Sequence, residues 1–132
     1  MKNYKEYTQE EVHAILYRFI RNYERFIKDK TSNIKLKAVL PNCDSQFYKL
    51  FGKNNYTWLK KGERPDTVKT NHIYMTENRN SVMLCFLTHL RHALCHNGMT
   101  EENNTFQFKN RKSSIGCFEK DMFLQLIEPF CK

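Results

Sequence analysis

The sequence predicts an all-α fold: a compact helical bundle around an antiparallel pair of long helices, with a small β-hairpin near the C-terminus. Apolar residues recur at the helical period in two long segments, residues 8–28 and 76–97. Further along, residues 105–108 and 115–118 alternate in polarity, as strands do. The chain has 132 residues, which suits one domain with one core. We therefore expect a single domain over residues 1–132.

The first long segment has a clear start signal. Thr8 and Glu11 have the spacing of a capping box, in which a hydroxyl and a carboxylate satisfy free backbone N–H groups. The apolar stripe behind it consists of Val12, Ile15, Leu16, Phe19, Ile20, Tyr23, Phe26 and Ile27. Off this stripe lie Arg18, Arg21, Arg25 and Lys28. We expect a core-facing helix with a basic outer face.

The middle of the chain gives weaker signals. Residues 34–40 form a short apolar segment stopped by Pro41, and their pattern leaves a helix and an extended piece both open. Residues 47–51, before Gly52, predict another short helix. Residues 53–69 contain glycine, proline and several lysines, and we expect a loop with a short ordered piece there.

The second long segment predicts a helix from about Thr76 to about Asn97. Its core face consists of Val82, Met83, Phe86, Leu87, Leu90 and Leu94. Asn97-Gly98 is a typical C-terminal stop. Beyond it, we expect the hairpin to turn across residues 109–114, and a short closing helix over residues 122–127 to end before Pro129.

The composition favours an anionic partner and an intracellular location. Lysine and arginine outnumber aspartate and glutamate by 22 to 14, giving a formal net charge of +8. A polyanion such as RNA would gain from this balance, because each neutralised phosphate releases counterions. Residues 1–7 are polar and unlike a signal peptide, and no stretch has the length of a membrane span. We therefore expect a cytoplasmic protein that does not associate with membranes.

The cysteines agree with a reducing compartment. There are five, an odd number, with no C-x-x-C pair: Cys43, Cys85, Cys95, Cys117 and Cys131. In a chain without a secretion signal, this pattern indicates reduced thiols rather than a disulfide framework.

The second long segment also carries the candidate chemistry. At 100° per residue, His89, His92 and His96 fall within about 60° of one another on the helix, and Arg91 stands beside them. An imidazole can transfer protons at cellular pH, and an arginine can hold a phosphodiester by two hydrogen bonds. Since RNA carries its own nucleophile, these groups could cleave it without a metal. Alternatively, the three histidines could bind zinc and support a zinc-dependent hydrolase.

The segment Arg91-His92-Ala93-Leu94-Cys95-His96 resembles the signature of HEPN domains. That signature is an arginine, usually followed by asparagine, aspartate or histidine, and then a histidine after four to six intervening positions. Here His92 fills the polar position and four residues separate Arg91 from His96. The order of predicted elements is also similar: an amphipathic helix first, the motif late on a second long helix, and strands after it.

The resemblance implies a HEPN-like fold and a metal-independent endoribonuclease built as a homodimer, with a composite site and no cofactor. It implies that His96 acts as general base or acid, that Arg91 binds the scissile phosphate, and that His92 positions or assists. The products would be a 2′,3′-cyclic phosphate and a 5′-hydroxyl. His89 lies outside the motif, and with Arg91 we assign it to substrate binding.

Two further expectations come with the family resemblance. Many relatives serve as toxins or in defence against phage, so a growth-inhibiting role and an antitoxin partner belong to the hypothesis. Some members are inactive, so a module that binds RNA or nucleotides without cleaving them stays open as the alternative.

Overall fold

A five-stranded mixed β-sheet organises the fold, in the strand order β1-β2-β5-β4-β3. The computed structural model describes residues 4–29, 36, 38–111 and 113–131. The strands are β1 (Tyr56–Trp58), β2 (His72–Met75), β3 (Met99–Glu102), β4 (Thr105–Asn110) and β5 (Ser114–Glu119). The fold is therefore mixed α/β, and the predicted all-α, HEPN-like bundle is wrong.

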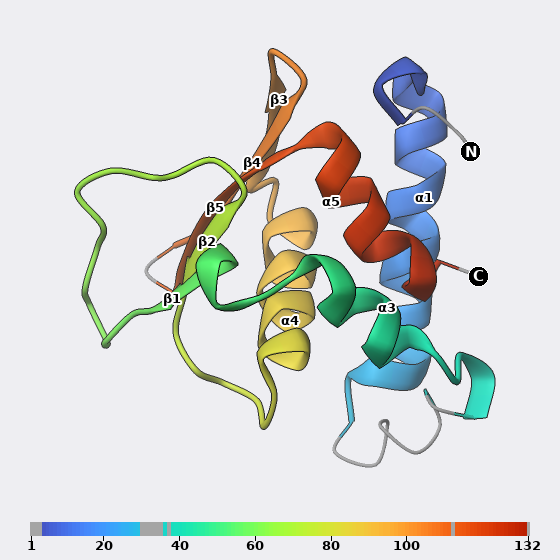
Figure 1. Cartoon of the computed structure of the whole chain (residues 1–132), viewed down its shortest axis with the longest axis horizontal. Coiled ribbons are helices and arrows are strands. Elements are labelled where there is room, and N and C mark those ends of the chain that lie inside the picture. The colour runs from blue at the N-terminus through green and yellow to red at the C-terminus, as the bar shows by residue number, and fades with distance from the viewer. Residues whose placement is uncertain (1–3, 30–35, 37, 112, 132) are drawn as a thin grey trace.

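The helices gather on one side of this sheet, and the β1–β2 connection, residues 59–71, extends on the other side (Figure 1). The α-helices are α1 (Gln9–Asn22), α3 (Cys43–Leu50), α4 (Val82–Cys95) and α5 (Lys120–Ile127). Shorter turns are η1 (Tyr4–Glu6), the π-helical η2 (Tyr23–Ile27), η3 (Lys53–Asn55) and η4 (Glu128–Phe130). Helix α4 packs against β4 and β2, so it lies directly on the sheet.

The first predicted helix is confirmed. The Thr8 hydroxyl accepts a hydrogen bond from Glu11 N at 3.1 Å, and Thr8 N donates to Glu11 Oε1 at 3.1 Å, which completes the capping box. Helix α1 then continues through η2 as far as Ile27. Val12, Phe19 and Ile27 are buried, as the apolar stripe predicts.

The second predicted helix is confirmed, but its start was placed too early. Helix α4 begins after Ser81, whose hydroxyl accepts a hydrogen bond from Leu84 N at 3.1 Å. The preceding residues form β2 and its connection instead. All four residues of β2 are buried, including His72, so the strand shows no alternation of burial that would reveal it. Residues Met83–Leu90 of α4 are buried without interruption, because the sheet covers one side and η2 and α3 cover others.

The C-terminal hairpin is confirmed and is longer than predicted, with β4 and β5 paired antiparallel from Thr105↔Glu119 to Asn110↔Ser114. Strand β2 joins β5 antiparallel, and β1 joins β2 parallel. Phe108 lies opposite Gly116. A Cβ at Gly116 would lie 2.6 Å from the Phe108 ring, so only glycine leaves room for this buried ring.

The two faces of the sheet differ. The face toward the helices is apolar and contributes buried residues to one core cluster: Ile73, Met75, Phe106, Phe108 and Phe118. The opposite face, which we call the outer face, carries the alternate side chains of β4 and β5, which include Gln107, Lys109, Ile115 and Cys117.

The structure describes most of the other predicted elements. The short helix near residues 47–51 is confirmed as α3, and the closing helix as α5. The loop over residues 53–69 contains η3 and β1 as its ordered pieces. Of residues 34–40, for which a helix and an extended piece were both open, the structure describes 36 and 38–40, and residues 36, 38 and 39 are helical. Residues 34, 35 and 37 lie outside the described residues. All five cysteines are free thiols. In the part of the chain that is described, no helix is long and apolar enough to cross a bilayer.

Candidate functional site

Arg91, His92 and His96 lie on the C-terminal end of α4. Leu90 and Ala93 are fully buried against the core and fix the rotation of the helix. The intervening positions therefore face outward: Arg91 and His92 are half-buried, and His96 is exposed. His96 caps the helix, with its N–H directed at the carbonyls of His92 and Ala93.

Arg91 is held by an acidic residue of η2. Its Nε and Nη2 donate to Glu24 Oε1 at 2.9 and 2.6 Å, and its guanidinium carbon lies 5.8 Å from the centre of the Tyr23 ring. Lys28 Nζ lies 3.3 Å from the other oxygen of Glu24. Burial raises the pKa of the Glu24 carboxyl, but the contacts with Arg91 and Lys28 outweigh it and leave that pKa below its usual value. Two cations thus converge on one carboxylate.

His92 lies between the other two motif residues. Burial lowers the pKa of its imidazole, and the charges of Arg91 and His96 lower this pKa further. The carboxamide nitrogen of Asn110 lies 3.4 Å from His92 Nδ1. Because an amide nitrogen only donates, Nδ1 is the acceptor and the neutral ring carries its proton on Nε2. Burial and the neighbouring charges favour this neutral form, which donates from Nε2.

His89 is placed differently from the other histidines. Its side chain is only 1% exposed, and its Nε2 donates to the carbonyl of Thr76 at 2.7 Å. Burial lowers the pKa of this imidazole, which the hydrogen bond to Thr76 partly offsets. Its Nδ1 is buried without a partner among the described residues. The fold thus joins Arg91, His92 and His96 at the surface and keeps His89 beneath them, covered from a surface ligand.

The zinc alternative gains no geometric basis from this arrangement. It needs His89, His92 and His96 around one ion. Within the described ranges, no group of three or more histidine, cysteine, aspartate or glutamate side chains is arranged to hold a metal. The covered ring of His89 explains why this triple does not form such a group.

Comparison with known proteins adds no relative. No protein-family model matches the chain, and neither a curated protein nor a solved structure matches it. The site is therefore interpreted from its own geometry.

Two residues of this site were not predicted from the sequence. Glu24 had one available signal, because it is a lone acid among the basic residues on the outer face of the first helix. Its contact with Arg91, 67 positions away, is not local and leaves no periodic pattern. Asn110 is the last residue of β4, next to the turn of the hairpin, where asparagine is common for conformational reasons alone.

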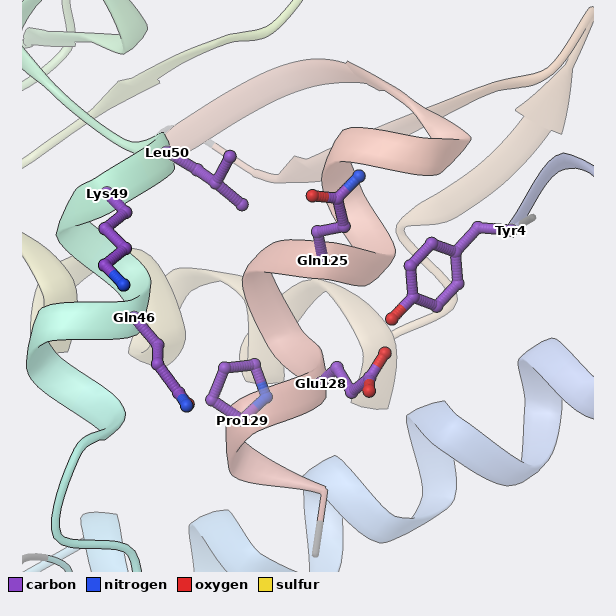
Figure 2. Close-up of a pocket in the computed structure, with 7 residues that line it drawn as sticks. All are labelled: Tyr4, Gln46, Lys49, Leu50, Gln125, Glu128 and Pro129. Carbon is purple, nitrogen blue, oxygen red and sulfur yellow. The ribbon is translucent and has the colours of Figure 1, made fainter. Parts of the chain in front are cut away.

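A separate hollow of about 330 Å³ lies between α3 and the α5–η4 segment. Figure 2 shows its lining, where Gln46 and Lys49 of α3 lie across from Glu128 and Pro129. Helix α3 contacts the opposite end of α4, since Met83 N donates to Tyr48 Oη at 2.9 Å. This hollow is therefore distinct from the group of Arg91, His92 and His96, which we call the Arg91–His96 cluster. Its lining carries charges of both signs, on Lys49 and Glu128.

Proposed function

We propose that this chain is a metal-independent endoribonuclease that uses Arg91, His92 and His96. One observation carries the proposal: Arg91 already binds an oxyanion, the Glu24 carboxylate, through two N–H groups, and two histidines stand beside it at an exposed helix end. A phosphodiester carries the same charge on similar acceptor oxygens, so it suits the same cationic group.

In the proposed reaction, His96 takes the proton from a ribose 2′-hydroxyl. The 2′-oxygen forms a bond to phosphorus, and the bond from phosphorus to the 5′-oxygen breaks with its electron pair on the leaving oxygen. That oxygen takes a proton from water, and His96 returns its proton to water. The products are a 2′,3′-cyclic phosphate and a 5′-hydroxyl.

Arg91 and His92 stabilise the charge on the phosphate in this scheme. Among the described residues, Arg91 Nη1 forms no hydrogen bond, so this edge serves a phosphate oxygen while Glu24 orients the other edge. The neutral His92 donates from Nε2 to a second nonbridging oxygen, and Asn110 fixes the tautomer that makes this donation available. His89 supports α4 from below through Thr76.

The HEPN resemblance supports the same reaction through its motif, Arg91-His92-x-x-x-His96, although the all-α architecture that it implied is absent. A long helix precedes the motif, the motif ends a second long helix, and strands follow. A homodimer with a composite site belongs to this proposal, as do a toxin or phage-defence role and an antitoxin partner, all of which rest on the resemblance.

A second candidate is an RNA-binding module without cleavage. The ion pair between Arg91 and Glu24 favours this candidate. The Glu24 carboxylate occupies the Arg91 guanidinium and so competes with the scissile phosphate for it. In that case the same cationic surface binds RNA while the chemistry is absent.

The test uses purified parent protein with Arg91→Ala and His96→Ala, each incubated with end-labelled RNA in EDTA. Matched controls are Arg25→Ala and His13→Ala, which remove the same side chains from exposed positions outside the cluster. We expect the parent and both controls to leave cyclic phosphates and the two cluster variants to leave the RNA intact. RNA that stays whole with the parent, with or without added zinc, contradicts the nuclease proposal.

A further inference from the structure

The outer face of the sheet carries a hollow of about 440 Å³, within the usual range for ligand sites of about 300–1,000 Å³. Its floor comes from neighbouring positions of three strands: Thr100 of β3 pairs with Gln107 of β4, and Gln107 pairs with Cys117 of β5. In the next row, Lys109 pairs with Ile115. Val68, from the β1–β2 connection, also lines the hollow. No residue of the Arg91–His96 cluster lines it, so it is a site of its own.

This hollow begins where α4 ends. Asn97 and Gly98, which directly follow His96, line it. Lys109 N donates to Gly98 O at 2.7 Å, which ties the end of α4 to β4. Asn110, the next residue, contacts His92. Because Lys109 and Asn110 are consecutive in a strand, their side chains leave opposite faces of the sheet. An RNA strand bound at the surface of His92 and His96 can therefore reach the hollow by passing the end of the sheet.

The lining suits a nucleobase with its phosphate. Lys109 is the one charged side chain among the lining residues, and it is exposed. The Gln107 carboxamide can both donate to and accept from the edge of a base, and the Thr100 hydroxyl beside it can do the same. Ile115 and Val68 offer apolar contacts for the faces of a ring. The β1–β2 connection extends on the same side of the sheet (Figure 1). It contains more exposed cations than acids: Lys60, Lys61, Arg64 and Lys69 against Glu63 and Asp66.

We propose that this hollow binds one unpaired base of an RNA strand whose backbone continues to Arg91, His92 and His96. The inference rests on the proposed ribonuclease function and names its substrate class, single-stranded RNA. An unpaired base suits the hollow better than a paired one, because its Watson–Crick edge is free to form hydrogen bonds with Gln107. Proteins read RNA sequence mostly on such unpaired bases.

Other hollows that border helices fit this ligand less well, and the one lined by Arg18 also contains Glu11 and Glu128. The hollow in Figure 2 also has a glutamine and a lysine, Gln46 and Lys49, but the Glu128 carboxylate repels a phosphate there. A third hollow, between α1 and β3, contains Glu101 and no lysine or arginine. The Gln46/Lys49 pair thus provides a matched control for the Gln107/Lys109 pair.

The experiment measures RNA binding by fluorescence anisotropy in a His96→Ala background, which prevents cleavage. The probe is a labelled unpaired RNA oligonucleotide, compared with the same strand annealed to its complement. We expect Gln107→Ala/Lys109→Ala to weaken binding of the unpaired strand about tenfold or more, and Gln46→Ala/Lys49→Ala to leave it within about twofold. We also expect the duplex to bind more weakly than the unpaired strand.

A second measurement avoids substitution in the hollow. Cys117 lines it and is partly exposed, whereas Cys43, Cys85 and Cys131 are buried. We expect unpaired RNA to slow alkylation of Cys117 by N-ethylmaleimide, followed by peptide mass spectrometry. Unchanged Cys117 reactivity with RNA bound, or equal affinity of the parent and Gln107→Ala/Lys109→Ala, overturns the inference.

The outcomes separate this inference from the proposed function. If the parent cuts RNA and the Gln107→Ala/Lys109→Ala variant binds it as tightly as the parent, the base site is ruled out and the nuclease proposal stands. If the Gln107→Ala/Lys109→Ala variant binds RNA more weakly but the parent never cuts it, the nuclease proposal is ruled out and the base site stands. Absence of both binding and cleavage removes both.

Discussion

Glu24 accepts two hydrogen bonds from Arg91, at 2.9 Å from Nε and 2.6 Å from Nη2, and thereby joins η2 to the end of α4. Tyr23 lies against the same guanidinium. Burial alone would lower the pKa of Arg91, but the hydrogen bonds to Glu24 raise it. Glu24 therefore both orients the arginine and occupies the charge that a phosphate would need.

Removing this charge tests which effect dominates for RNA. We expect Glu24→Gln to tighten RNA binding about threefold to tenfold, because the competing negative charge is lost while a side-chain oxygen remains. The free energy of unfolding should change by less than about 1 kcal/mol, since the pair is partly exposed. Titration with labelled RNA measures the affinity, with Glu10→Gln as an exposed control on α1. Weaker binding by Glu24→Gln alone would show that orientation of Arg91 matters more than competition.

Arg91 and His96 should both influence the protonation of His92. Burial, Arg91 and His96 all lower the pKa of His92. We therefore expect His96→Gln to raise the pKa of His92, by removing one nearby charge, while burial and Arg91 keep it below its ordinary value. NMR titration of the imidazole protons gives this pKa directly, with His13→Gln as the control. An unchanged His92 titration would mean that His96 does not lie near His92 in solution.

His89 should make the stability of the protein depend on pH. Burial lowers the pKa of its imidazole in the folded state. The resulting stabilisation is fully present above the unfolded-state pKa of about 6.5, and is lost as the pH falls from there through the lower folded-state pKa. We expect His89→Gln, which can keep an N–H directed at Thr76, to lose less stability than the parent between about pH 7.5 and about pH 5. Urea unfolding at both pH values measures this, and equal losses would contradict it.

The sheet offers a test of the fold itself. We expect Gly116→Ala to lower the free energy of unfolding by about 1–3 kcal/mol, because the added Cβ meets the buried Phe108 ring. Gly52→Ala serves as the control, since a Cβ there has no heavy atom within 4 Å. Chemical denaturation of the two variants compares them. Similar stabilities would show that Phe108 is not packed over residue 116.

The sequence predicted the elements that depend on interactions between neighbours in the chain, and it failed for strands that depend on distant partners. The capping box of Thr8 and Glu11, the hairpin and the closing helix depend on neighbours in sequence, and all three were predicted. Strand β2 was missed because its four residues are all buried and its partner β5 lies some forty residues later. Strands β1 and β3 were missed because they are short, and β3 is mostly polar. With these three strands included, the sheet replaces the expected helical bundle.

The candidate site was predicted to a similar extent. The helical period places Arg91, His92 and His96 at one end of α4, as expected from the residues. The period could not show that His89 would lie under the surface, because that depends on the carbonyl of Thr76 in a connection that was predicted to be helical. The contacts with Glu24 and Asn110 come from other elements and have no counterpart in the local pattern.

The edges of the sheet bear on how copies of this chain can meet. Strand β3, at one edge, includes Glu101 and Glu102, both exposed, and β1, at the other edge, has only three residues. Two copies placed edge to edge along β3 would bring carboxylates together, and along β1 they would share few backbone hydrogen bonds. Extension of the sheet from one molecule into the next is therefore unfavourable at either edge. This protects the chain against strand-mediated aggregation, and it directs any search for a self-association surface to the helices.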